Sequence, residues 1–305
     1  MKWKKLGNLY SISNLCEELV SHCANPLPIH IGDDVYKIYF SGRDENNRSS
    51  VGAVDIDVVK RKVIKTYDKP FFKAGEDGTF YQDGVSIGNW YEVNGQRYIL
   101  FMGWQTKDKA HWRGDIGRLK LNSDYSLSLE PSTPYITTDN IDKVSLSYPW
   151  VEKISNNNYV MYYGSTVDWH SSNGEMIHVI NYAVSTDGEI WEKKGLAIPY
   201  EYGKVQAFSR PSVIKINEKY HMWVSSRGPG GISKYRIYHS VSNDGIHWSK
   251  ISDNKDSGID VSNSGWDSEM ICYPYVFDHK GERYMLYNGN GYGKTGFGIA
   301  VLEEE

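Results

Sequence analysis

The chain has 305 residues, of which 40% are hydrophobic and 24% are charged, which is an ordinary composition for a globular protein. Its formal net charge of −4 and the lack of a long basic run exclude the usual kind of nucleic-acid-binding surface. No stretch of 18 apolar residues occurs, so the sequence predicts no membrane span.

The first twenty residues contain lysines but neither a long apolar core nor a small-residue cleavage site, so we expect no signal peptide. The three cysteines, Cys16, Cys23 and Cys272, have neither the spacing of a metal site nor the even number of a disulfide framework. A cytoplasmic location is therefore the expectation. The one helical candidate lies at residues 14–20.

Two markers recur five times along the sequence. One is a run of aromatic and β-branched residues that starts at Tyr36, Tyr98, Tyr159, Tyr220 and Tyr284, with spacings of 62, 61, 61 and 64. The other precedes each run and starts at Asn25, Asp83, Tyr148, Arg210 and Tyr273, with spacings of 58, 65, 62 and 63. Two markers that keep step in this way indicate an internal repeat of ~60 residues.

Each repeat has the pattern of strands joined by turns. Its apolar runs are separated by turn clusters such as VNGQ, SNNN, INEK and DHKG. Two repeats continue with S-x-D-G-x-x-W, at 185–191 and 242–248, where Asp-Gly favours a hairpin turn. A repeat of ~60 residues with about four strands is typical of a propeller blade. The sequence therefore predicts an all-β, five-bladed β-propeller of four-stranded antiparallel blades, with 1–305 as one domain and blade starts near 25, 83, 148, 210 and 273.

The glycine-rich C-terminal segment "NGNGYGKTGFGIAVLEEE" contains Gly293-Lys294-Thr295, which resembles the end of a phosphate-binding loop. Such a loop needs a first glycine, where this chain has Asn288, and a helix after the threonine. The residues after Thr295 have the pattern of a strand instead. We therefore interpret the segment as two strands of the last blade joined by a tight, glycine-rich connection.

The marker that precedes each aromatic run begins with a polar or amphipathic residue, where a buried strand would prefer valine or isoleucine. Because the first strand of a propeller blade faces the channel, we expect these residues to converge in a ligand site: Asn25, Asp83, Tyr148, Arg210 and Tyr273. The alternative is that they only solvate a water-filled channel. Blade starts and second-strand ends add further candidates: His22, Arg43, Asp44, Trp104, Asp168, Arg227, Trp266, Asp267, Glu269, Asn288 and Asn290. Each has a structural alternative; Arg43 with Asp44, for example, could be a surface ion pair.

The motifs SHCANP, YFSGRDENNRS, FYQDGVSIG, SRPSV, GWDSEMICYP and YNGNGYGKTGFGIA, which span residues 21–301, carry a resemblance to a known family. The sequence resembles the five-bladed propeller glycoside hydrolases of the arabinanase, levansucrase and invertase type, with families 43, 32 and 130 as relatives. It is most similar to a subgroup encoded beside bacterial surface-glycan synthesis genes. The resemblance implies a carbohydrate pocket without a cofactor, although a structural divalent ion on the channel axis is an option in such propellers.

The resemblance also implies two or three carboxylates in this pocket, because glycoside cleavage protonates the leaving oxygen while the opposite face of the sugar is attacked. At matching positions it assigns catalysis to Asp83 and Glu269, with Asp168 and Asp267 in support. Arg43, Arg210 and Arg227 would bind hydroxyls, carboxylates or phosphates. One departure is plain: where related propellers commonly place a glutamate as general acid, this chain has Gln206, which cannot donate a catalytic proton.

Three functions stay open at this point. The first is a carbohydrate-active, glycoside hydrolase-like enzyme that uses carboxylate acid–base chemistry in bacterial glycan metabolism. The second is a transferase or phosphorylase acting on a sugar nucleotide or phosphosugar, which the arginines favour. The third is a non-catalytic glycan-binding propeller, since fold does not fix function. The expected partners are therefore small carbohydrates, sugar nucleotides or phosphosugars.

Overall fold

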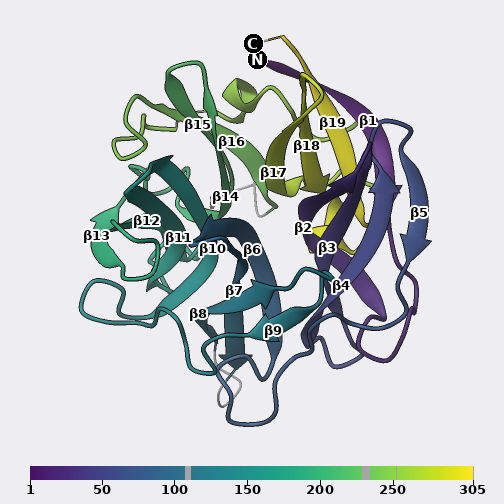
Figure 1. Ribbon diagram of the computed structural model, residues 1–305. Coiled ribbons are helices and arrows are strands. Elements are labelled where there is room, and N and C mark those ends of the chain that lie inside the picture. The colour runs from purple at the N-terminus through teal and green to yellow at the C-terminus, as the bar shows by residue number, and fades with distance from the viewer. Residues whose placement is uncertain (107–110, 229–233, 252, 305) are drawn as a thin grey trace.

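The computed structural model describes residues 1–106, 111–228, 234–251 and 253–304, and these are almost entirely β-strands (Figure 1). Antiparallel pairing divides the described strands into five groups, which Figure 1 shows arranged around a common centre. Buried side chains from several groups, including Phe40, Phe101, Tyr162 and Phe208, form the largest hydrophobic cluster. The N- and C-terminal ends lie side by side.

The first two groups share one eight-stranded sheet. The first contains β2 (Ser21–Gly32), β3 (Val35–Arg43), β4 (Ser49–Asp57) and β5 (Lys62–Thr66). The second contains β6 (Gly84–Val93), β7 (Gln96–Thr106), β8 (Trp112–Leu121) and β9 (Leu127–Leu129). A single parallel contact, Ser49 with Gly84, joins the two groups.

The next two groups share a seven-stranded sheet. The third contains β10 (Ser145–Ser155), β11 (Asn158–Asp168), β12 (Ile177–Ser185) and β13 (Glu192–Leu196). The fourth contains β14 (Ala207–Ile216), β15 (Lys219–Arg227) and β16 (Arg236–Ser242), and an isolated bridge between Ser242 and Trp248 lies where the repeat predicts a fourth strand. One parallel contact, His178 with Ala207, joins these groups.

The last group is built from both ends of the protein. It contains β17 (Cys272–His279), β18 (Glu282–Asn288) and β19 (Phe297–Glu304), and its outer strand is β1 (Lys2–Tyr10) from the N-terminus. β1 pairs antiparallel with β19 from Lys2–Glu304 to Tyr10–Phe297. The ring of groups is therefore closed by backbone hydrogen bonds between the first and last strands of the sequence.

Helical structure is minor within the described ranges. A 3-10 helix, η1 (Asn254–Ser257), follows β16, and α1 (Asn290–Gly293) is a short turn whose residues Gly291 and Tyr292 have left-handed φ angles of 65° and 59°. The helix considered at 14–20 is absent; a bridge between Cys16 and Leu19 closes a tight turn there. None of the helices in the described part of the protein is long and apolar enough to cross a membrane.

The glycine-rich segment after β18 behaves as the sequence indicates, since a strand rather than a helix follows Thr295. Gly293 has a φ of 93°, and a Cβ atom on it would lie 2.6 Å from Asn288 Nδ2 and 3.1 Å from Ala24 Cα. Glycine is required here because the backbone turns left-handed against the neighbouring group. The segment is thus a tight connection, and no helix follows Thr295 to hold a phosphate.

Every inner strand carries a register shift at one equivalent place. The shifts fall between Ala24 and Leu27, Ile87 and Trp90, Ser147 and Trp150, Ser209 and Pro211, and Cys272 and Tyr275. The residues at the shifts are Asn25, Gly88, Tyr148, Arg210 and Tyr273. Gly88, not Asp83, is therefore the second member of the set, and a Cβ on it would lie 2.1 Å from the Pro149 carbonyl oxygen.

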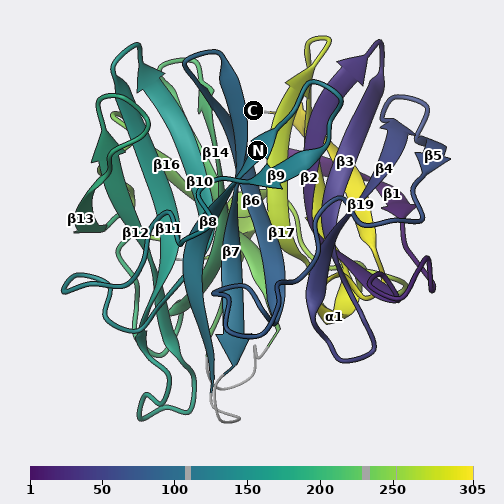
Figure 2. The same cartoon turned by 60° about the horizontal axis from the view of Figure 1, so that its bottom comes forward.

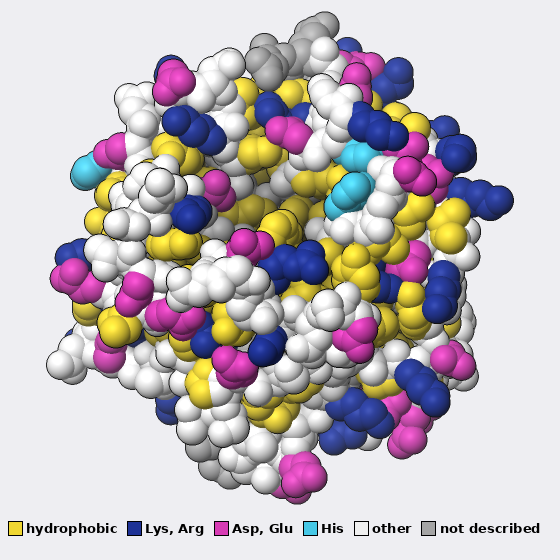
Figure 3. All heavy atoms as spheres, in the orientation of Figure 1, with side chains coloured by type: hydrophobic (Ala, Val, Ile, Leu, Met, Phe, Trp, Pro, Cys, Tyr) yellow, Lys and Arg dark blue, Asp and Glu magenta, His cyan; other side chains and the backbone are white. Residues whose placement is uncertain are grey.

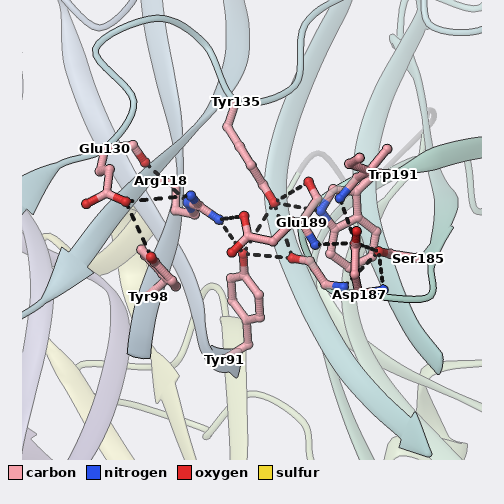
Figure 4. Close-up of polar contacts among 11 residues, drawn as sticks. Tyr91, Tyr98, Arg118, Glu130, Tyr135, Ser185, Asp187, Glu189 and Trp191 are labelled. Carbon is pink, nitrogen blue, oxygen red and sulfur yellow. Dashed lines mark hydrogen bonds and ion pairs between the residues drawn. The ribbon is translucent and has the colours of Figure 1, made fainter. Parts of the chain in front are cut away.

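Arg118 on β8 links the second and third groups (Figure 4). Its Nη1 atom donates to Glu189 Oε2 at 2.5 Å and to the Tyr91 hydroxyl at 3.3 Å. Its guanidinium also lies 4.0 Å from the ring centre of Tyr98 and 4.4 Å from that of Tyr135. Since Glu189 lies in the S-x-D-G-x-x-W turn, this turn serves as a contact between neighbouring groups as well as a hairpin.

We expect Arg118→Met to lower the free energy of unfolding by about 2 kcal/mol, because it leaves a half-buried carboxylate and a buried tyrosine hydroxyl without their donor. Urea denaturation followed by tryptophan fluorescence measures the change. Arg113→Met is the matched control on the same strand, since the Arg113 side chain is 45% exposed and its charge lies 3.5 Å from Asp115. Equal effects of both substitutions would contradict a linking role for Arg118.

Candidate functional site

Two adjoining cavities, of about 380 and 150 Å³, are lined in part by Tyr292 of α1. Figure 2 shows α1 at one end of the ring, and the cavities lie at that end. We call them together the front cavity, because they share the lining residues Arg43, Trp112, Tyr148, Tyr273 and Tyr292. Their walls come from the starts of inner strands, the ends of second strands, the starts of β8 and β12, the connections beside these strands, and α1. A concave site lined by aromatic rings and a few polar groups is the usual form of a small-ligand site.

Aromatic rings form a large part of the cavity wall. Trp169 stacks on His111 with ring centres 4.7 Å apart, and Trp112 meets Trp169 edge to face at the same distance. Tyr148 and Tyr273 lie 5.4 Å apart with their hydroxyls 3.3 Å from each other. Such rings present flat apolar faces and polar edges, the combination that suits the faces and hydroxyls of a sugar ring.

Arg43, at the end of β3, lines both parts of the front cavity. Its guanidinium makes no hydrogen bond or ion pair with any residue that the structure describes, although its charge acts on the nearby His22 and Tyr148. Half-buried cations are ordinarily paired. Arg43 therefore has five N–H donors free to meet a ligand in the cavity.

Arg227, at the end of β15, faces the same cavity but is already paired. Its Nη2 donates to Glu175 Oε1 at 3.2 Å, and its Nε lies 3.1 Å from Oε2 without the alignment of a hydrogen bond. Its Nη1 donates to the Tyr292 hydroxyl at 3.1 Å. Glu175 is the only carboxylate among the described residues that line the front cavity.

Gln206 holds the loop that carries Glu175. Its Nε2 donates to the Met176 carbonyl oxygen at 3.2 Å, and its Oε1 accepts from Asn173 Nδ2 and the Gly203 N–H at 2.7 Å each. Its side chain is fully buried. The residue that stands where relatives commonly have an acid is thus a structural support beneath the loop.

Two histidines near the cavity are neutral at physiological pH. Burial, and then the charge of Arg227, lower the pKa of His178 to about 3, while its ring nitrogens contact Ser147 Oγ at 2.7 Å and Thr166 Oγ1 at 2.8 Å. Burial, followed by the charges of Arg43 and Lys294, lowers the pKa of His22 to about 4. Apart from His111, the charged groups among the described lining residues are two arginines and one glutamate, which leaves the cavity cationic.

The structure brings together six of the residues expected from the sequence, all of which line the front cavity: Asn25, Arg43, Trp104, Tyr148, Arg227 and Tyr273. Asn25 has a buried Oδ1 atom without a partner in the described residues. Trp104 donates from Nε1 to Ser49 Oγ at 3.1 Å. Because inner-strand starts and second-strand ends lie at one end of the ring, the position of these six follows from the repeat.

The three carboxylates assigned to catalysis lie outside this cavity. Asp83 accepts the Thr106 N–H with its side chain, and Asp168 is exposed and accepts the His170 N–H at 2.8 Å. Glu269 is exposed and pairs with Lys234, which lowers the pKa of the Glu269 carboxyl below its ordinary value. A general acid needs a raised pKa, so the environment of Glu269 is opposite to that role.

Arg210 supports the channel and does not line the cavity. Its side chain is 1% exposed and donates to the carbonyl oxygens of Tyr273 at 2.7 Å, Pro26 at 2.8 Å and Gly88 at 3.4 Å. These acceptors belong to three other inner strands. Burial lowers the pKa of Arg210 to about 10, which keeps it charged at neutral pH.

The remaining sequence candidates have structural partners. Asp267 pairs with Lys5 at 2.7 Å, and Asp44 pairs with Arg48 at 2.9 Å. His22 contacts Ser21 Oγ at 2.9 Å. The last three lie in or beside the final group. Trp266 packs on Tyr287, and Asn290 accepts the N–H groups of Glu269 and Met270. Asn288 forms hydrogen bonds with the backbone of Cys23, Asn25 and Gly296.

No set of three or more His, Cys, Asp or Glu side chains in the described ranges is arranged to hold a metal ion. An axial divalent ion would also need oxygen donors, and three inward carbonyls already accept from Arg210. The residues present therefore do not fit that ion.

Sequence reasoning missed Glu175, Trp112, Trp169, Tyr235 and Tyr292. The first three lie in or directly beside the connections after β7 and β11, outside the two repeated markers. The tryptophans had a usable signal, since each stands beside a histidine in a polar segment, as HW at 111–112 and WH at 169–170.

No family model matches this protein. Solved structures with a similar fold include an RGII complex of BT0996, with a TM-score of 0.74 and 14% identity over 99% of this chain and 93% of that one. Another, described as a glycoside hydrolase, has a TM-score of 0.71 and 14% identity over 98% and 91%. The endo-arabinase of Bacteroides thetaiotaomicron gives 0.63 and 15% over 93% and 95%. The fold is thus that of the propeller-type glycoside hydrolases.

Two curated relatives match along the whole sequence. They are the uncharacterized proteins MT1551 and Rv1502 from two strains of Mycobacterium tuberculosis. Each is 41% identical over 305 residues, which cover 99% of this chain and 100% of the relative. The chain therefore belongs to the same family as these two proteins.

Proposed function

We propose that this protein is a five-bladed β-propeller in which each antiparallel group is one blade, and that its front cavity binds an anionic carbohydrate. The blade count is supported by the five equivalent register shifts. Placing Gly88 in the set gives spacings of 63, 60, 62 and 63, more even than those with Asp83. The similarity to propeller-type glycoside hydrolases supports a sugar as the ligand.

The observation that carries the anionic preference is the Arg43 guanidinium, which faces an aromatic cavity and has no partner among the described residues. Arg227 balances Glu175, so Arg43 supplies the net positive charge. Arginine binds carboxylate and phosphate oxygens through two parallel N–H donors. A sugar phosphate, a sugar nucleotide or a uronic acid offers such an anion beside a ring that the tyrosines and tryptophans can cover.

Hydrolysis by paired carboxylates fits this cavity less well. That reaction needs an acid and a base, or an acid and a nucleophile, on opposite sides of the scissile bond. The described lining offers Glu175 alone, and Glu175 is held by Arg227. Recognition of an anionic sugar is therefore the function that the geometry supports best.

A second candidate is a transferase or phosphorylase that acts on a sugar nucleotide or phosphosugar. It is favoured by Glu175 lying beside two arginines, because one carboxylate can take the proton of an attacking hydroxyl while the arginines hold a phosphate leaving group. On this proposal the protein serves cytoplasmic glycan metabolism in bacteria. Release of phosphate or nucleotide in the presence of an acceptor sugar would distinguish it from binding alone.

Isothermal titration calorimetry with glucose 1-phosphate, glucuronic acid and glucose tests the proposal. We expect both anionic ligands to bind roughly tenfold or more tightly than glucose, because a charge-assisted hydrogen bond contributes about 1.5–3 kcal/mol. Asp83→Asn and Glu269→Gln are the controls, and neither should change these affinities. Equal affinity for glucose and its phosphate would contradict the proposal. A loss of binding in Asp83→Asn would indicate that the ligand binds near Asp83 and not in the front cavity.

A further inference from the structure

A second and larger cavity, of about 590 Å³, opens at the opposite end of the ring. We call it the back cavity. Its lining lies on the inner strands beyond their register shifts, on β2, β6, β10 and β17, with Tyr36 and Tyr159 from second strands. Figure 3 shows the molecule hollowed at the centre of this face, with hydrophobic side chains around the hollow. Arg210 lies between the two cavities and lines neither.

Aromatic rings dominate the back cavity, as they do the front one. Trp150 and Tyr275 meet at its base with ring centres 4.8 Å apart, and Trp90, Tyr91 and Phe277 add further wall. The Trp150 side chain is 4% exposed, and its indole N–H lies beside the Glu152 carboxyl.

Glu152, beside Trp150, is a partly buried carboxyl in the wall of this cavity. It forms no ion pair with any described residue, and burial raises the pKa of its carboxyl to about 7. The neighbouring Trp150 indole N–H acts on this carboxyl as a hydrogen-bond donor and lowers its pKa, against the larger effect of burial. The adjacent Asn89, by contrast, is fully used, since its amide bonds both the Val151 N–H and carbonyl at 2.8 and 2.9 Å.

The other titratable groups in the lining of the back cavity do not pair with Glu152. Lys153 turns to the Tyr159 ring, 5.3 Å from its centre. Asp278 is paired with Arg283 at 2.7 Å, and Glu92 on β6 adds a further negative charge. His30 contacts the Asp33 carbonyl at 3.0 Å. The lining is therefore negative, with an unpaired carboxyl placed among electron-rich rings.

We propose that the back cavity binds a small organic ammonium ion, with Glu152 as its counter-ion and the indole and phenol rings as its cage. Cations are attracted to the faces of tryptophan and tyrosine rings, and quaternary ammonium groups are bound by aromatic cages in this way. A carboxylate at the base of the cage adds direct charge pairing. This site goes beyond the anionic sugar site, since the two cavities have opposite charge and Arg210 separates them.

Calorimetric titration with choline tests the proposal, and 3,3-dimethylbutan-1-ol, which has the same shape without the charge, is the matched ligand. We expect choline to bind at least tenfold more tightly than the alcohol. Glu152→Gln should remove that difference, and Trp90→Leu at the cavity wall should weaken choline several-fold. Glu192→Gln, which changes an exposed carboxylate on β13, should leave choline binding unchanged.

Equal binding of choline and the alcohol by the wild-type protein would overturn the proposal whatever the variants do. Retention of the preference in a folded Glu152→Gln variant would also overturn it. Arg43→Met should abolish the preference for glucose 1-phosphate and leave choline binding intact, so a failure at one cavity is distinguishable from a failure at the other.

Discussion

Arg210→Met is expected to lower the free energy of unfolding by about 3 kcal/mol, the largest effect on stability that we predict for a single side chain. The guanidinium of Arg210 donates to carbonyl oxygens on three other inner strands. Methionine fills a similar volume but leaves those buried acceptors without a donor. Relief from burying a charge without a carboxylate partner offsets part of the loss.

Urea denaturation, monitored by circular dichroism, measures this effect. Arg61→Met is the matched control, because among the described residues the exposed Arg61 donates to a single carbonyl, that of Leu6 at 3.2 Å, and its replacement should cost less than about 0.5 kcal/mol. Arg210→Lys should fall between the two, since an ammonium ion keeps the charge but cannot span three acceptors. A change below about 1 kcal/mol for Arg210→Met would show that the channel does not depend on this residue.

The role of Arg210 also shows what a repeat can and cannot reveal. Spacing alone places Asn25, Tyr148, Arg210 and Tyr273 at equivalent positions, and their φ angles of 56°, 40°, 43° and 55° agree with a shared backbone geometry. The spacing does not show that the Arg210 side chain points into the channel and binds carbonyl oxygens there. Direction depends on the positions of neighbouring strands, which one repeat unit does not encode.

Choosing Asp83 as the equivalent position in the second repeat assumes that this position must carry a polar side chain. The structure has Gly88 at the register shift, where only a glycine fits against the Pro149 carbonyl. The even spacing of the other four starts is the signal for this position. A search for reactive or charged side chains selects Asp83 and misses Gly88, which close packing requires.

Other features escape prediction because they depend on contacts between distant parts of the sequence. β1 completes the last group by pairing with β19, at the other end of the protein, and nothing within Lys2–Tyr10 specifies that partner. Glu175 lies in a connection outside the repeated markers, and the buried Gln206 fixes it there. Strand order and site location thus follow from periodicity, whereas the one carboxylate among the described lining residues of the front cavity depends on a loop.

Arg43→Met is expected to weaken binding of glucose 1-phosphate by about 2 kcal/mol, or roughly thirtyfold in Kd, while leaving the weak binding of glucose unchanged. Arg43 faces the cavity without a partner in the described residues, so its donors are used only when a ligand is present. Arg43→Lys should retain part of the preference, because a lysine keeps the charge but loses the paired donors. Calorimetric titration of each variant with both ligands measures the difference.

Arg43→Met should weaken ligand binding without lowering the stability of the protein. A half-buried cation without a partner costs folding free energy, so Arg43→Met should unfold at the same or a higher urea concentration than the wild-type protein. Arg48→Met, which removes a partly exposed arginine paired with Asp44 at 2.9 Å, is the matched control and should leave the affinity for glucose 1-phosphate unchanged. Loss of stability together with unchanged binding in Arg43→Met would assign this residue to structure instead.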